Sequence, residues 1–337
     1  MLKSPITSAA LAAILLSTLI ISTASYYWPI QEPFHAYNDG PDGCSTLLTL
    51  VRNPLLVYSY GTPIPASISI LAIIGPTVPF TVNEANVIRS FLVSGGRVLL
   101  AEDHGSGNSL LERLSIGVRF SGTQISDLYF YSKQRFFPLI SQFAGDPITY
   151  NLTSIVMSRP SYLQIQEPGS IKVLAQSSPL SFIDYKGDGV LMPNETTQSY
   201  PVIASARIGL GTLILVSDAA TFTNGMIHAN DNTKLFLNIV TLSTGVMGYD
   251  LAHIPSAPLT AQRISFKNQI DAVAISLQPT PLRAIVTVAI IIGFSILFLL
   301  SVVSKKQFAI RRRDRAGNQA YILRLQAFSG RLQSWRC

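Results

Sequence analysis

Two polar loops carry side chains that could act as acids, bases or nucleophiles. The first loop holds Asp103, His104, Ser106 and Asn108 directly after an apolar run. The second loop begins at Asp218 and continues with Asn224, His228, Asp231 and Asn232. A carboxylate, an imidazole and a hydroxyl can form the acid, base and nucleophile of a hydrolase. The same residue types also bind ligands and cap helices, so catalysis, binding and a purely structural role stay open.

Sequence motifs that accompany catalysis are missing from both loops. There is no Gly-x-Ser-x-Gly sequence, and HGSGN (104–108) lacks the lysine of a phosphate-binding loop. His228, Asp250 and His253 are spaced too loosely to predict a metal site. We therefore predict no catalytic residue, metal or cofactor. The candidate residues for binding a ligand or partner are Asp103, His104, Ser106, Asn108, Asp218, Asn224, His228, Asp231, Asn232, Asp250 and His253.

Apolar runs and a helical pattern alternate ahead of the first loop. Residues 67–75 are a continuous apolar run, as expected of a strand buried on both faces, and residues 97–103 (RVLLAED) are predicted as a second buried strand. Between them, residues 81–96 have helical periodicity and begin with a capping box of Thr81 and Glu84. This alternation predicts a parallel sheet, which places ligands beyond the carboxyl ends of its strands.

The rest of the central region predicts further α/β structure. Helices are expected at 45–53, 107–117 and 231–245, strands at 171–178, 181–185 and 200–218 with a turn at 209–211, and β segments or loops at 128–140 and 148–165.

Both ends of the chain carry long apolar segments. Residues 6–25 contain no charge, and residues 282–303 contain one, Arg283 at the edge. Each is long enough to span a bilayer, which takes about 20 residues. The first predicts an anchor or, as an alternative, a cleaved signal peptide in which Ser22 and Ala24 precede the cleavage site.

Charge distribution predicts the orientation. The tail from Ser304 to Cys337 has nine basic residues and one acidic residue, so its net charge is 9 − 1 = +8. The net charge of the whole chain is only +7. Basic residues remain on the cytoplasmic side. We therefore predict a two-pass protein of the cell membrane with an extracytoplasmic domain and a cytoplasmic C-terminus. The central domain lacks the positive charge of a nucleic-acid-binding surface.

The predicted organisation follows from these segments. It comprises an anchor or signal peptide (1–28), a linker (29–46), an α/β domain (47–255), a second linker (256–281), a transmembrane helix (282–303) and a basic tail (304–337). The tail contains AYILRLQAFSGRLQSW, a basic amphipathic pattern suited to the anionic inner leaflet, to partner docking or to disorder. The lipid bilayer and membrane proteins are thus the expected partners.

Two cysteines and two sequons are the remaining sites of possible covalent chemistry. Cys44 and Cys337 are predicted on opposite sides of the membrane, so they cannot pair within one chain. Cys44 is expected to be an ordinary buried residue. Asn151 and Asn194 begin Asn-x-Thr sequons and are candidate glycosylation sites.

Three sequence blocks resemble the family called "domain of unknown function 4350". They are FTVNEANVIRSFLVSGGRVLLAEDHGSGNSLLERL (80–114), YPVIASARIGLGTLILVSDAATFTNGMIHANDN (200–232) and YDLAH (249–253). Leu251 stands where the family usually has Glu. The resemblance covers about residues 40–255 and both anchors.

This resemblance implies an α/β, flavodoxin-like sandwich like the class I glutamine amidotransferase domain, with a mostly parallel sheet flanked by two transmembrane helices. It implies no proven activity. The cysteine nucleophile of that fold would fall at the turn 102–104, which has no thiol, so a glutaminase is not expected. The implied partners are AAA-type ATPases or transport components.

Together these features predict a membrane-anchored extracytoplasmic domain that binds a ligand or protein and does not catalyse. It would be a component of a larger membrane assembly or transport system. The alternative is a cell-surface hydrolase that uses the loop of Asp103, His104 and Ser106.

Overall fold

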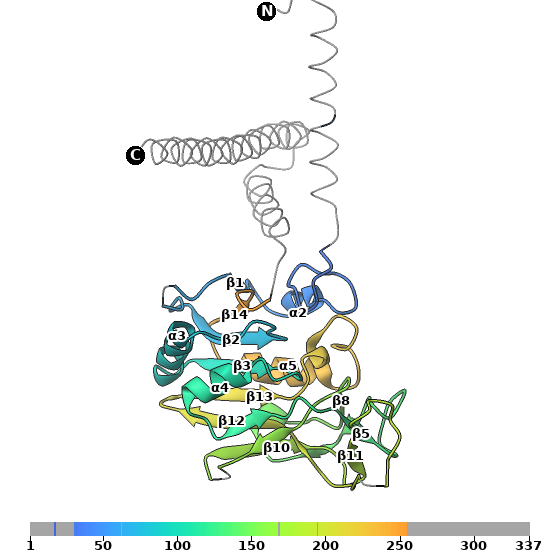
Figure 1. The fold of residues 1–337 in the computed structure, drawn as a ribbon. Coiled ribbons are helices and arrows are strands. Elements are labelled where there is room, and N and C mark those ends of the chain that lie inside the picture. The colour runs from blue at the N-terminus through green and yellow to red at the C-terminus, as the bar shows by residue number, and fades with distance from the viewer. Residues whose placement is uncertain (1–16, 18–29, 62, 168, 194, 255–337) are drawn as a thin grey trace, which may run out of the picture. The chain divides into compact units, whose positions relative to one another are not determined.

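An eight-stranded mixed sheet forms the centre of the domain. The computed structural model of the chain describes Ser17 and residues 30–61, 63–167, 169–193 and 195–254 (Figure 1). In spatial order the strands are β1 (Leu55–Val57), β14 (Val246–Asp250), β2 (Ile68–Ile74), β3 (Arg97–Ala101), β13 (Gly211–Val216), β12 (Pro201–Ile208), β10 (Ile171–Gln176) and β7 (Gln142–Phe143). The first five strands are parallel to one another, whereas β12, β10 and β7 are each antiparallel to the strand before them.

Helices cover both faces of this sheet, which explains why its central strands are apolar on both sides. One face packs against α3 (Val82–Val93) and α4 (Asn108–Leu114). The other packs against α2 (Ser45–Thr49) and α5 (Asn232–Thr241). Alternate residues of β3 enter the two cores, with Leu100 on the α3 face and Leu99 on the α5 face. The two cores together hold the sheet between the helices.

Local sequence signals position α3. The hydroxyl oxygen of Thr81 accepts a hydrogen bond from the Glu84 amide at 3.3 Å, and the Glu84 carboxylate accepts one from the Thr81 amide at 2.6 Å. This is the predicted capping box, which satisfies two amides that would otherwise lack partners. Ala85, Ile88 and Leu92 then place the apolar face of the helix against the sheet.

Short strands and two 3₁₀ helices surround the main sheet. They are β4 (Val118–Phe120) with β9 (Leu163–Ile165), β5 (Ile125–Asp127) with β11 (Ser181–Ile183), β6 (Leu139–Ile140) with β8 (Ile155–Val156), η1 (Pro147–Thr149) and η2 (Ala220–Phe222). Figure 1 shows β5, β8 and β11 close together beyond one end of the main sheet. We call residues 121–140 and 177–193 the edge lobe.

The fold corrects the predicted fold class and localisation. The domain is a mixed α/β sheet, because three antiparallel strands continue the five parallel strands on one side. Nowhere in the described part of the chain is a helix both long and apolar enough to cross a membrane. The longest, α3, has 12 residues and spans about 18 Å, against roughly 30 Å for a hydrocarbon core.

The flanking transmembrane helices and the two-pass localisation therefore lack support and are withdrawn. The predicted spans 6–25 and 282–303, the second linker (256–281) and the basic tail lie outside the described residues.

Part of the expected linker 29–46 belongs to the core. His35, Ala36, Asn38 and Cys44 are buried. Cys44 is fully buried, as predicted for an ordinary small core residue. Proline, glycine and asparagine gave this segment a loop-like composition, but these four side chains still pack inside the domain.

Candidate functional site

The five parallel strands end at one edge of the sheet, which we call the carboxyl edge. The register pairs Ala101 of β3 with Val216 of β13, and the Glu102 amide donates to the Val216 carbonyl at 2.9 Å. Asp103 and Asp218, which follow these strands, therefore lie at the same edge. Asp250 ends β14 at this edge as well. Parallel register thus brings together the starts of both loops singled out from the sequence.

Glu102 shapes the first loop from inside the domain. Its side chain is buried, and one carboxylate oxygen accepts hydrogen bonds from the amides of His104 at 2.5 Å and Gly105 at 2.6 Å. The other oxygen accepts from the Gly107 amide at 3.3 Å. Burial raises the pKa of Glu102, although these amides favour the charged carboxylate. The loop is held by a residue that the sequence analysis had assigned only to a strand.

Asp103 and His104 form the exposed part of this edge. The Nε2 atom of His104 lies 3.4 Å from the Asp103 carboxylate, and the imidazole side chain is 82% exposed. The Asp103 side chain is only 16% exposed. Burial raises the pKa of Asp103, and the neighbouring His104 charge opposes that rise. The pair presents a solvent-facing imidazole over a largely buried carboxylate.

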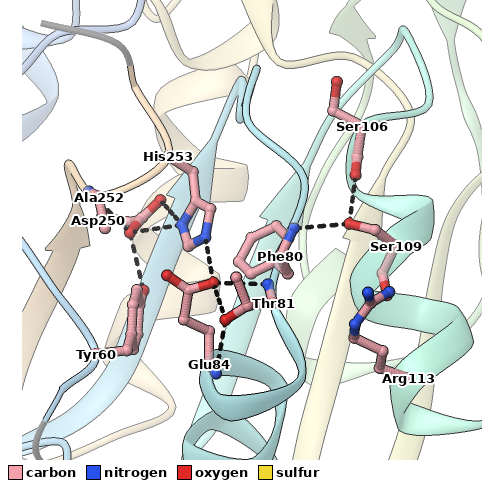
Figure 2. A network of polar contacts seen from close by, with 10 residues as sticks. All are labelled: Tyr60, Phe80, Thr81, Glu84, Ser106, Ser109, Arg113, Asp250, Ala252 and His253. Carbon is pink, nitrogen blue, oxygen red and sulfur yellow. Dashed lines mark hydrogen bonds and ion pairs between the residues drawn. The ribbon is translucent and has the colours of Figure 1, made fainter. Parts of the chain in front are cut away.

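Ser106 and Asn108 serve the structure of the loop and of α4. The Asn108 side-chain amide donates to the Phe120 carbonyl, and its oxygen accepts from the Phe120 amide, both at 2.9 Å. The Ser106 carbonyl accepts from the Ser109 hydroxyl at 3.0 Å, as Figure 2 shows. Within the described residues no hydrogen bond joins the Ser106 hydroxyl to His104. The contact that the alternative hydrolase would need between Ser106 and His104 is therefore not formed in this structure.

Asp218 is fully buried at the end of β13. Its carboxylate accepts hydrogen bonds from the Ser158 amide at 2.6 Å, the Thr221 hydroxyl at 2.7 Å and the Ala220 amide at 2.8 Å. The pKa of Asp218 is raised to about 7, mainly by burial and secondly by the negative charge of Asp103. Asp218 thus holds neighbouring loops together and does not face solvent.

Asn224 joins the second loop to the N-terminal segment. Its side-chain amide donates to the carbonyls of Asn38 and Gly40, each at 2.8 Å, and its oxygen accepts from the Thr46 amide at 2.8 Å. His228, four residues later, is exposed. Asn224 therefore has a structural role that fully uses its hydrogen-bonding groups.

Asp231 and Asn232 bind the backbone around β8. The Asp231 carboxylate accepts from the amides of Thr153 at 2.6 Å and Ser154 at 3.2 Å. Buried Asn232 accepts from the Val156 amide at 3.0 Å and donates to the Val156 carbonyl at 2.9 Å. Both residues start α5 and attach it to this distant segment.

His253 lies between two carboxylates near the start of α3 (Figure 2). Its Nδ1 is 3.0 Å from the Asp250 carboxylate, and its Nε2 is 3.6 Å from the Glu84 carboxylate. The Tyr60 hydroxyl donates to Asp250 at 2.9 Å, and the Phe80 ring stacks on the imidazole with centroids 3.7 Å apart. Asp250 and His253, two candidate site residues, therefore form a buried structural network.

Two further observations concern metals and modification. No group of three or more His, Cys, Asp or Glu side chains in the described part of the chain is arranged to hold a metal ion. Asn151 is exposed and has a φ of 54°, whereas Asn194 lies outside the described residues.

A family model described as "Domain of unknown function (DUF4350)" matches residues 36–240, which is more than half of the chain. The chain belongs to this family. The DUF4350 match includes Asp103 and Asp218, and it ends before Asp250 and His253. It confirms the family resemblance, but it does not confirm the glutamine amidotransferase-like fold or the membrane anchors that the resemblance implied.

Solved structures resemble the DUF4350 domain only distantly. The mmIFT52 N-terminal domain is 19% identical, with a TM-score of 0.42, over 53% of this chain and 79% of that one. A ThuA-like protein from Bacteroides uniformis is 15% identical, with a TM-score of 0.31, over 51% of this chain and 67% of that one. A β-galactosidase from Rahnella sp. R3 is 15% identical, with a TM-score of 0.28, over 47% of this chain and 19% of that one. No curated protein matches.

Sequence reasoning missed two aspartates that organise the edge lobe. The Asp127 carboxylate accepts from the Phe130 amide at 2.7 Å and from the Ser181 hydroxyl at 2.7 Å. The Asp184 carboxylate accepts from the Ser126 hydroxyl at 2.8 Å and the Gly189 amide at 2.7 Å. Each is an acidic residue at the end of an apolar β segment, which is the same signal that pointed to Asp103 and Asp218.

Proposed function

We propose that this DUF4350 domain is a non-catalytic binding domain that recognises a protein partner at its carboxyl edge. The observation that supports it is the exposed His104 imidazole above the Asp103 carboxylate. The two side chains lie 3.4 Å apart, and His104 is 82% exposed, so its imidazole is available to a partner.

The loop that carries this pair is already ordered for binding. Three amides of the loop donate to buried Glu102, so the loop is held in one conformation by charge-assisted hydrogen bonds. A preordered loop loses little conformational entropy when a partner binds. The cost of recognition at His104 is correspondingly small.

The edge lobe adds surface of the kind that proteins use for recognition. Tyr129 is 75% exposed and Tyr185 is 69% exposed, and both belong to this lobe. Exposed tyrosines supply large contact areas and are common among the residues that dominate protein interfaces. They favour a protein partner, for which the family resemblance suggests AAA-type ATPases or transport components.

The hydrolase alternative has less support in the same loop. A nucleophile and its base have to lie within about 3.2 Å of each other. Among the described residues, the Ser106 hydroxyl has no such contact with His104. Asp218, the other candidate acid, is occupied by three donors.

Matched histidine variants of the full chain test the proposal. Proteins captured by the tagged chain from its source cells are identified, purified and titrated against wild type, His104→Gln and His228→Gln. Both histidines are exposed, but only His104 contacts the Asp103 carboxylate, so His228→Gln is the control for loss of an exposed imidazole outside this pair. We expect His104→Gln to weaken binding about 5- to 30-fold, equivalent to about 1–2 kcal/mol, and His228→Gln to leave it unchanged.

Two results would overturn the proposal. One is a partner affinity that His104→Gln and Asp103→Asn both leave unchanged. The other is turnover of an ester or peptide substrate by the wild-type chain that is abolished in Ser106→Ala, which would establish the hydrolase instead.

A further inference from the structure

A cavity of about 650 Å³ lies at the opposite edge of the sheet, near the amino ends of β3 and β13. It is on the face covered by α5, because Ile214 both lines the cavity and belongs to the core on that face. Its polar lining includes Arg97, Lys172, Ser205, Arg207 and Thr212. This site is separate from the carboxyl edge and independent of the function proposed for it.

The strand register places two arginines in one cross-strand row. Thr212 of β13 pairs with Arg97 of β3 on one side and with Arg207 of β12 on the other. Residues that are directly paired across strands point to the same face of a sheet. The Cα atoms of the two arginines are therefore about 10 Å apart, with one strand between them. Guanidinium groups at this separation can reach one common anion over Thr212.

The positive charge of this row is not neutralised by the described residues. Lys172 forms an ion pair with Asp146 at 2.6 Å, and both residues line the cavity. Arg97 donates to the Ser243 hydroxyl at 2.6 Å. Within the described part of the chain, neither Arg97 nor Arg207 pairs with a carboxylate. Two like charges on the same face of a sheet repel each other, so an anion bound between them would stabilise the row.

A second cavity of about 800 Å³ adjoins the first. Arg97 and Leu242 line both cavities. The second extends toward the opposite, α3-covered face, because its apolar lining includes Ile64, Val87 and Phe91, which pack against the core on that face. Ligand sites commonly combine an apolar wall with a few polar groups that fix orientation. Arg97 is the first residue of β3, so a ligand with its anionic group in the first cavity would pass Arg97 at this edge of the sheet to place an apolar body in the second.

We propose that these two cavities bind a small organic anion. Its carboxylate or phosphate lies between Arg97 and Arg207, with the Thr212 hydroxyl as a further donor, and its apolar body lies against Phe91 and Val87. Arginine suits this role because its planar group donates two parallel hydrogen bonds to either anion.

Calorimetric titration of the full chain with simple probes tests this site. Hexyl phosphate and hexanoate carry the two candidate anionic groups on the same alkyl chain, and inorganic phosphate lacks the alkyl chain. Arg97→Gln and Arg207→Gln each remove one guanidinium group. Arg119→Gln is the matched control, because Arg119 lies on β4 and is not among the residues that line either cavity.

We expect hexyl phosphate or hexanoate to bind wild type and Arg119→Gln equally, and to bind each of the other two variants at least 10-fold more weakly. Inorganic phosphate should bind more weakly than hexyl phosphate. Arg207 is exposed, so its variant folds even if loss of the Arg97 contact with Ser243 perturbs the domain. The proposal is overturned if neither organic anion binds the wild type. It is also overturned if Arg207→Gln binds as wild type does.

Discussion

The imidazole of His253 lies 3.0 Å from the carboxylate of Asp250, and both side chains are buried. This contact connects the end of β14 to the start of α3, because the other imidazole nitrogen faces Glu84 in the capping box. The same Asp250 carboxylate accepts a hydrogen bond from the Tyr60 hydroxyl. One buried acid thus fixes three segments that are far apart in the sequence.

Asp250→Asn should therefore destabilise the domain strongly. The amide preserves the size of the side chain but removes the charge that the Tyr60 and His253 contacts stabilise. We expect a loss of about 2–4 kcal/mol in the free energy of unfolding in urea. Asp39→Asn is the control, since Asp39 is exposed and a surface change costs about 0.5 kcal/mol or less. Equal stabilities for the two variants would show that the network contributes nothing.

Asp218 should make the domain less stable as the pH rises from about 4 to 7. In the unfolded chain this carboxyl ionises near pH 3.9, whereas its pKa in the folded domain is raised to about 7. Between these values the unfolded chain has released the proton and the folded domain retains it, so rising pH favours unfolding. The difference corresponds to at most about 4 kcal/mol.

Urea unfolding at several pH values measures this effect, and Asp218→Asn is expected to show a shallower decline than wild type. Glu102 and Asp103 have raised pKa values and act in the same direction, whereas Glu84 has a lowered pKa and acts in the opposite one. All three remain in the variant, so the difference reports on Asp218. Identical slopes in the two proteins would contradict the assignment.

Asn108→Ala should cost about 2–3 kcal/mol of stability. The substitution removes two hydrogen bonds and leaves the amide and carbonyl of Phe120 without their partner. Asn83→Ala in the first turn of α3 is the comparison, because Asn83 is exposed. Thermal or urea unfolding distinguishes the two, and a loss below about 0.5 kcal/mol in Asn108→Ala would argue against this structural role.

Cys44 should be inert in the folded chain. Burial raises the pKa of its thiol to about 12, and the thiolate is the reactive form. In a Cys337→Ser variant, we expect an aromatic disulfide reagent at pH 8 to react at least 100-fold faster in urea than in buffer. Rapid reaction of the native protein would mean that the 35–46 segment opens readily.

Much of the central sheet could be predicted because its signals are local. The apolar run of β2 and the capping box of α3 depend on neighbouring residues, and both are found where the sequence placed them. In contrast, β1 and β14 are short, and they form a sheet only with each other and with β2. Nothing near residues 55–57 reveals a partner almost two hundred residues away.

The shared edge of Asp103 and Asp218 was predictable from the sequence, but the contacts of the residues around it were not. Parallel strand ends predicted that Asp103 and Asp218 would share an edge, and they do. Asn224 and Asn232 were also candidate binding residues, because they are polar and follow a predicted strand. Their partners are backbone groups of distant segments, so only the folded chain shows that their hydrogen-bonding capacity is already used.

The place of β14 in the sheet has a consequence for synthesis on the ribosome. This strand is made last among the eight, yet it lies between β1 and β2. Until residue 250 leaves the exit tunnel, the nascent chain carries an open edge on β2 and an unpaired segment at 55–57. A holdase that shields this edge during translation would protect the chain, and any message truncated before codon 246 would yield a product destined for proteolysis.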